Sequence, residues 1–185
     1  MKRSTLLTLA AAALAIAAAG TWLVVGRQPV AAVGRPVALN TPLPSIIGRT
    51  LAGAAFDSAD FRGRPTVINA WATWCTPCQR EQPALVSLAL RYGSRVRFVG
   101  IDFRDDAAAA RRWVKQQFHV PYPSLFDPSG RTAHLLKYPL GLPDTYVVDG
   151  SGVIRWAIYG QLDERELAGA IDQVLAGEPG GSPSP

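Results

Sequence analysis

Hydrophobic residues in this chain fall into short runs, separated by turn residues and by longer amphipathic stretches. Residues 66–71 are apolar on both faces of a strand, which is the pattern of a strand at the centre of a covered sheet. Further strands are predicted at residues 94–102, 144–149 and 153–159, and residues 120–126 form a proline-interrupted edge segment. Because a tight Gly-Ser-Gly turn joins the last two strands, they are predicted to pair as a hairpin.

Helices are predicted in the intervals between these strands. The longest begins after Cys75 and runs to about Tyr92, where Gly93 stops it, and Pro83 inside it should produce a kink. Three shorter helices are predicted at residues 105–118, 131–138 and 163–175. This alternation predicts an α/β fold with a largely parallel sheet that is covered by helices on both faces. The final hairpin should add an antiparallel edge.

The segment ahead of the central strand is also predicted to fold. Residues 44–56 predict a short hairpin, with Gly48 and Gly53 as candidate turn positions, and residues 57–63 predict a one-turn helix. The folded domain is therefore expected to span residues 44–176.

The N-terminal residues 1–26 are the longest apolar stretch of the chain. After Lys2 and Arg3 no charge appears until Arg27, and such a run is long enough to span a hydrocarbon core of ~30 Å. A cleaved signal peptide and an uncleaved signal anchor both fit, and the length of the apolar run favours the anchor. Residues 27–43, which contain three prolines, are predicted to tether the domain on the extracytoplasmic side, periplasmic or outer, of the cell membrane.

Composition and charge exclude several classes of function. An apolar fraction of 48% can supply a core, and a charged fraction of 18% is too low for a disordered polyelectrolyte. The net charge of +5 overstates the basic character of the domain, because Lys2, Arg3 and Arg27 belong to the leader and its flank. No cluster of Lys and Arg with interleaved aromatic residues occurs, so nucleic acid is not expected as a partner. Residues 177–185 are expected to form a disordered tail.

The chemistry of the chain is concentrated in Cys75 and Cys78, its two cysteines. They follow the central strand and lie three positions apart at the start of the longest predicted helix, so one disulfide can close between them. A thiol at a helix N-terminus has a lowered pKa, because the unpaired N–H groups favour the thiolate. Such a thiolate can attack the disulfide of another protein, after which the second cysteine resolves the mixed disulfide.

A structural disulfide and a zinc site are weaker interpretations of the cysteine pair. A structural disulfide that closes so short a loop restrains little chain entropy. Zinc usually requires four ligands, and the two histidines, His119 and His134, lie in unrelated stretches. The pattern therefore favours a redox pair, and neither a metal nor a cofactor is predicted.

Two motifs connect the chain with a known family. Residues 71–83 read W-x-x-W-C-x-x-C-x-x-E-x-P, and residues 141–149 read G-x-P-x-T-x-x-x-D. With these motifs the chain resembles the thioredoxin superfamily, and within it the exported, membrane-tethered thiol-disulfide reductases of the TlpA, ResA and DsbE type, which serve cytochrome c maturation. The resemblance covers residues 41–176. It implies a thioredoxin-like fold, in which helices cover both faces of a central mixed sheet, with an N-terminal hairpin and one β-α insert.

The resemblance also implies roles for residues near the cysteines. Pro143 would follow a cis peptide bond and face the cysteine pair, and Leu142 would offer its backbone groups to a bound substrate strand. Trp74, Thr76 and Pro77 are candidate substrate contacts, and the last two should also set the redox poise of the pair.

Glu81 is the candidate acid/base group. It lies three positions after Cys78 and therefore shares a helix face with it. The family pattern gives this glutamate the task of tuning the cysteines and of moving the proton to or from Cys78. A carboxylate beside the pair raises thiol pKa values and implies a modest reductant. The alternative is a solvated acid in the first helical turn. Thioredoxin itself has a buried aspartate six residues before its first cysteine, where this chain has Asn69, which cannot take a proton.

Together these features predict a membrane-anchored, extracytoplasmic thiol-disulfide oxidoreductase that reduces protein disulfides. The resemblance implies the haem-attachment cysteines of apocytochrome c as the target and an integral membrane thiol transporter as the electron donor. Two alternatives stay open: an oxidase that introduces disulfides, and a copper-site assembly factor that carries Cu(I) or keeps a copper-site protein reduced. A general antioxidant role is a further option.

Overall fold

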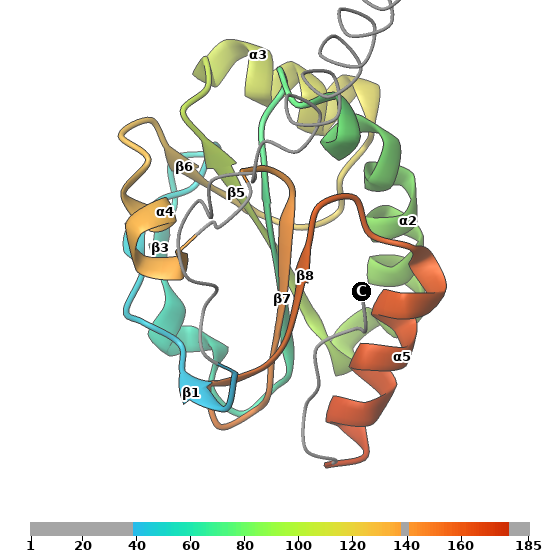
Figure 1. The fold of residues 1–185 in the computed structure, drawn as a ribbon. Coiled ribbons are helices and arrows are strands. Elements are labelled where there is room, and N and C mark those ends of the chain that lie inside the picture. Colours follow the sequence, from blue (N-terminus) through green and yellow to red (C-terminus); the bar gives the residue numbers. More distant parts are fainter. Residues whose placement is uncertain (1–38, 138–140, 178–185) are drawn as a thin grey trace, which may run out of the picture. The chain divides into compact units, whose positions relative to one another are not determined.

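The computed structural model describes residues 39–137 and 141–177, in which helices pack against a six-stranded sheet (Figure 1). The predicted membrane segment, residues 1–26, lies outside the described residues, as do most of the predicted linker and tail. Among the helices of the described ranges, none has both the length and the apolar character needed to cross a bilayer.

The sheet has the strand order β1-β8-β7-β4-β5-β6 and is mixed, as predicted. Its strands are β1 (Thr41–Pro42), β4 (Thr66–Trp71), β5 (Arg97–Phe103), β6 (Ser124–Asp127), β7 (Asp144–Val148) and β8 (Val153–Tyr159). All six residues of β4 are buried, which confirms the predicted central strand. β5 begins later than predicted, because residues 93–95 form a single 3₁₀ turn, η2 (Gly93–Arg95).

Pairing is parallel on one side of β4 and antiparallel on the other. β4, β5 and β6 are parallel neighbours, whereas β7 is antiparallel to β4, and β8 and β1 continue the antiparallel half. The expectation of a largely parallel sheet is wrong for this half. β7 begins at Asp144 beside Ala70, near the carboxyl end of β4, and runs back along it. β1 pairs with β8, so the sheet starts within the predicted linker and β8 is not an edge strand.

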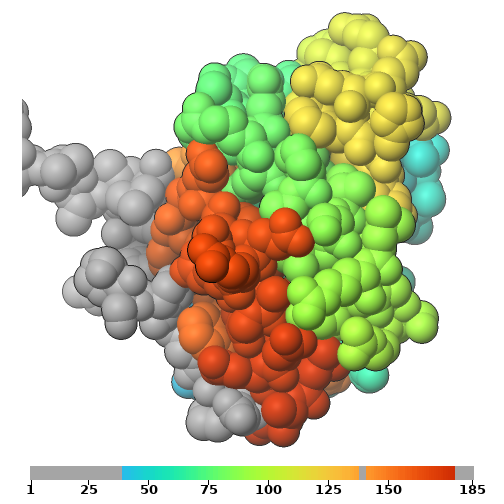
Figure 2. All heavy atoms as spheres, turned by 90° about the vertical axis from the view of Figure 1, so that its right-hand side faces the viewer, coloured from blue at the N-terminus to red at the C-terminus, as the bar shows by residue number. Residues whose placement is uncertain are grey.

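Both faces of the sheet are covered. On one face lie α2 (Thr76–Tyr92) and α5 (Glu164–Leu175), which run side by side in Figure 2. Their apolar residues, such as Leu85, Leu88 and Ile171, pack with Val67 and Val147 of the sheet. The other face packs against α4 (Arg131–Leu136), the 3₁₀ turn η1 (Ser58–Phe61) and the N-terminal hairpin. β6 and α4 supply the additional β-α unit that the resemblance implies.

The predicted N-terminal hairpin consists of β2 (Ile47–Arg49) and β3 (Ala55–Asp57). Gly53 lies in its turn with a φ of +85°, a conformation that favours glycine. Gly48 is not a turn residue, which corrects that prediction, because it pairs with Phe56 inside the hairpin. A Cβ at Gly48 would lie 2.6 Å from Leu125 Cδ1, so glycine permits the close approach of β2 to β6.

The predicted helix at residues 105–118 is divided into two parts. α3 (Ala107–Arg112) is α-helical and continues into η3 (Trp113–Gln117), which is a π-helical turn. Asp106 caps α3 by accepting a hydrogen bond from the Ala109 N–H at 2.8 Å. A π turn widens the helix locally and is frequent at functional sites. Here it places Trp113 against Trp71 of the central strand, with ring centroids 4.0 Å apart in a stacked arrangement.

Candidate active site

The two cysteines lie where the central strand passes into α2. β4 ends at Trp71 and α2 begins at Thr76, so Cys75 is the N-cap residue of the helix. Cys75 and Cys78 form a disulfide with their Cα atoms 5.3 Å apart. Cys75 Sγ also accepts a hydrogen bond from the Cys78 N–H at 3.2 Å. When the pair is reduced, this donor and the positive end of the helix favour a thiolate at Cys75.

The disulfide is more enclosed than a helix N-terminus alone suggests. Cys75 is 4% exposed and Cys78 1%, whereas Trp74 is one of the most exposed large hydrophobic residues, at 59%. Thr76 is exposed and Pro77 half-buried. Trp74 and Thr76 therefore lie at the surface beside the enclosed sulfur of Cys75.

Pro143 directly precedes β7, which is the strand next to β4. The peptide bond between Leu142 and Pro143 is cis, as the resemblance implied. Leu142 is half-buried and packs against the apolar cluster that contains both cysteines. Pro143 O accepts a hydrogen bond from the Gly160 N–H at 2.8 Å, which ties this loop to the end of β8.

Glu81 is buried beneath the cysteine pair on the same helix, with 2% of its surface exposed. The alternative interpretation as a solvated first-turn acid is therefore wrong. Its Oε1 accepts from Asn69 Nδ2 at 2.8 Å, and its Oε2 accepts from the Leu162 N–H at 2.9 Å. Burial raises the pKa of Glu81 to about 7, against the effect of the hydrogen bonds from Leu162 and Asn69. A carboxyl with this pKa can both take up and release a proton near neutral pH.

A second buried carboxyl, Asp144, follows Pro143 directly and has no exposed surface. Burial raises the pKa of Asp144 to about 8, and the charge of Glu81 raises it further, whereas interactions with Tyr146 and Gly160 lower it. The sequence prediction placed Asp144 only as the first residue of a strand. The available signal was a charged residue at the start of an otherwise apolar run.

The loop between β5 and α3 forms hydrogen bonds with Thr73 and Trp74, the two residues before Cys75. Asp105 accepts hydrogen bonds from both the N–H and the hydroxyl of Thr73. Trp74 Nε1 donates to the Arg104 carbonyl at 3.3 Å, and Gln79 Nε2 donates to the Thr73 carbonyl at 2.8 Å. Hydrogen bonds with the β5–α3 loop and with Gln79 of α2 thus hold the segment ahead of Cys75 in place. The sequence pattern did not predict these contacts.

No metal centre is evident in residues 39–137 and 141–177. These ranges contain no group of three or more His, Cys, Asp or Glu side chains placed to hold an ion.

The sequence is similar to those of known proteins. The sequence profile of the AhpC/TSA family matches residues 39–157. The thiol:disulfide interchange protein DsbE of Pseudomonas aeruginosa is 35% identical over 164 residues, which cover 86% of each chain. The chain belongs to the AhpC/TSA family, among the DsbE proteins. DsbE of Escherichia coli K12 is 34% identical over 89% of this chain and 90% of its own.

Solved structures agree with the fold. A DsbF homologue from Corynebacterium diphtheriae matches with a TM-score of 0.67 and 27% identity, covering 80% of this chain and 96% of its own. A secreted disulfide oxidoreductase of Mycobacterium tuberculosis, described as homologous to Escherichia coli DsbE, matches with a TM-score of 0.62 and 28% identity, covering 71% and 95%. With its Cys75–Cys78 pair, this member of the family is a thiol-disulfide oxidoreductase that acts on protein disulfides.

Proposed function

We propose that this protein is a reductant, and that its target is the disulfide formed by the haem-attachment cysteines of an apocytochrome c. The observation that carries the reducing direction is the buried Glu81, one helical turn beyond Cys78. An ionised carboxyl close to the pair raises thiol pKa values. The carboxyl therefore opposes stabilisation of the reduced, thiolate form, and it is this stabilisation that makes a cysteine pair a strong oxidant.

The proposed reaction moves two electrons from the cysteine pair to the target. The Cys75 thiolate attacks one target sulfur, and the other target sulfur leaves and takes a proton. Glu81 then accepts the proton of Cys78, whose thiolate attacks the Cys75 sulfur of the mixed disulfide. The target sulfur that was bonded to Cys75 leaves as a thiolate and is protonated, and the Cys75–Cys78 disulfide is restored.

The remaining site residues have proposed roles in binding. Leu142, next to Pro143, offers its backbone to an extended segment of the target. Trp74, Thr76 and Pro77 contact the target around the attacked disulfide. Re-reduction of the oxidised protein is assigned to an integral membrane thiol transporter, and residues 1–26 are proposed to hold the domain at the extracytoplasmic face of the membrane.

The reduction potential of the full chain, measured against glutathione and dithiothreitol buffers, tests the direction. A potential near or below the ~−270 mV of thioredoxin supports a reductant, and a potential near ~−120 mV makes the protein an oxidase instead. Reduction of an oxidised Cys-x-x-Cys-His peptide tests the target. Cys75→Ser is expected to abolish this reduction, and Cys78→Ser is expected to accumulate the mixed disulfide; unchanged turnover in either variant contradicts the mechanism.

A further inference from the structure

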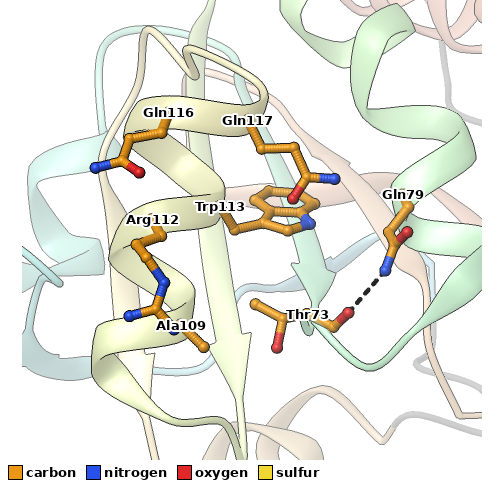
Figure 3. A pocket seen from close by; sticks show the side chains of 7 residues that line it. All are labelled: Thr73, Gln79, Ala109, Arg112, Trp113, Gln116 and Gln117. Atoms are coloured by element: carbon orange, nitrogen blue, oxygen red, sulfur yellow. Dashed lines mark hydrogen bonds between the residues drawn. The ribbon is translucent and has the colours of Figure 1, made fainter.

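A polar pocket adjoins the segment that leads into Cys75 (Figure 3). Its volume is about 410 Å³. It lies between α2 and the helix formed by α3 and η3, with Trp113 at its back and Gln79 facing the π turn. The residues that line it are Thr73, Gln79, Ala109, Arg112, Trp113, Gln116 and Gln117.

Two of the residues that line the pocket are close to the cysteines in the sequence. Thr73 is two residues before Cys75, and Gln79 is the residue after Cys78. Their hydrogen bond, Gln79 Nε2 to the Thr73 carbonyl, forms one wall of the pocket. An extended segment advances ~3.3 Å per residue, so a polypeptide joined to Cys75 reaches this wall within a few residues.

The wall formed by α3 and η3 is positively charged. Residues 107–117 contain Arg111, Arg112 and Lys115 and no acidic residue. Among the described residues, neither of the two ion pairs includes Arg112. The acids that precede the helix are already engaged, because Asp105 accepts from Thr73 and Asp106 caps α3. Arg112 is therefore a cation at the pocket without a carboxylate partner in the part of the chain that the structure describes.

Two further features fit a ligand that carries hydrogen-bond acceptors. Gln116 and Gln117 place side-chain amides at the rim, Gln116 next to Arg112 and Gln117 over Trp113 (Figure 3). Trp113 is 3% exposed, and its Nε1 finds no acceptor among the described residues. Figure 3 shows the nitrogen edge of this indole directed toward Gln79, across the pocket. A guanidinium with neighbouring amide donors is the chemistry that recognises a carboxylate.

We propose that this pocket binds an acidic side chain of the target polypeptide, a few residues from the disulfide that Cys75 attacks. Arg112 pairs with the carboxylate, and the glutamines donate to it or to the adjoining backbone. The pocket thereby selects targets with an Asp or Glu near their cysteines. This inference rests on the proposed reduction of a protein disulfide.

The test compares disulfide peptides that differ only in Glu or Gln at two, three or four residues from the first cysteine. The full-length protein, reduced beforehand, is expected to reduce the best-placed Glu peptide about fivefold faster in kcat/KM than its Gln partner, the upper range for an exposed ion pair. Arg112→Ala should remove this preference. Arg111→Ala is the matched control, since it removes the adjacent charge from a residue that does not line the pocket.

Bis(2-hydroxyethyl) disulfide, which is neutral and small, separates the two proposals. The control Arg111→Ala should reduce it at the wild-type rate. An unchanged Glu preference in Arg112→Ala, or an equal loss in Arg111→Ala, overturns the pocket as the recognition site. If the wild type reduces the small disulfide but none of the peptides, the proposed reductase function fails, and the pocket proposal fails with it.

Discussion

Asn69 of the central strand donates a hydrogen bond to Glu81 of α2, with 2.8 Å between Nδ2 and Oε1. The same amide nitrogen donates to Thr145 Oγ1 on the neighbouring strand at 3.0 Å. A residue that cannot itself take a proton thus orients the carboxyl that can. The geometry fixes Glu81 below the cysteines without adding a second charge at that position.

Glu81→Gln is expected to remove a pH dependence of stability. The pKa of Glu81 is raised from 4.5 to about 7 in the folded protein, so the unfolded chain ionises first as the pH rises. Stability therefore falls between pH 4.5 and about 7, by about 3 kcal/mol in total. Urea unfolding at pH 4.5 and pH 8 should show a smaller difference in the variant than in the wild type.

The matched control is Glu164→Gln, because Glu164 is an exposed carboxyl. It should keep the wild-type pH profile of stability. The Glu81 variant should also lose a step near pH 7 in the rate at which the mixed disulfide is resolved. A wild-type profile in both stability and rate would show that Glu81 does not titrate in this range.

Asp144→Asn is expected to stabilise the protein at high pH. Burial first, and then the charge of Glu81, raise the pKa of Asp144 from 3.8 to about 8. The protonated, buried acid contributes stability to the folded protein, and this contribution is lost as the pH rises from about 4 to about 8. The amide of asparagine does not ionise, so the variant keeps its stability over this range. Thermal unfolding at pH 5 and pH 8.5 should show the variant gaining more on the wild type at the higher pH. A gain of the same size at both values would contradict titration of Asp144.

Asp105→Ala is expected to loosen the segment ahead of Cys75. The carboxylate accepts hydrogen bonds from the N–H and hydroxyl of Thr73 and from the Asp106 N–H. Its loss should destabilise the protein by about 2 kcal/mol, because the Thr73 donors lose their acceptor. Attack by Cys75 on a peptide disulfide should also slow, as stopped-flow Trp fluorescence can measure. Asp106→Asn, which keeps a good N-cap residue, should change neither quantity appreciably.

Gly100→Ala is expected to destabilise the sheet beside the active site. A Cβ at Gly100 would lie 2.4 Å from Ser124 Oγ and 2.6 Å from Trp71 Nε1. Trp71 is buried and stacked on Trp113, so it cannot move aside, and overpacking of this kind costs about 2 kcal/mol. In Gly169→Ala, the control in α5, the new Cβ meets nothing within 4 Å, and stability should rise by about 1 kcal/mol. Chemical denaturation of the two variants should therefore give shifts of opposite sign.

Most elements of the fold and the cysteine pair follow from the sequence alone, whereas β1 and the π turn do not. The apolar run of β4 fixes a central strand, because only a covered sheet can bury six consecutive residues. The spacing of Cys75 and Cys78 allows one disulfide at a helix start, and Gly93 ends that helix as predicted. These features depend on local periodicity and on residue chemistry, which a sequence contains directly.

Strand direction and the electrostatics of the site were decided by tertiary structure. The local pattern of β7 is the same for a parallel and an antiparallel strand, and its position beside the carboxyl end of β4 selects the antiparallel pairing. The sequence left a solvated first-turn acid open as the alternative for Glu81, and its enclosure by β4 and the Leu162 backbone decided against that alternative. The contact between Asp105 and Thr73 joins residues 32 positions apart. Burial and long-range contacts set these properties, and they exist only once the strands and helices have packed together.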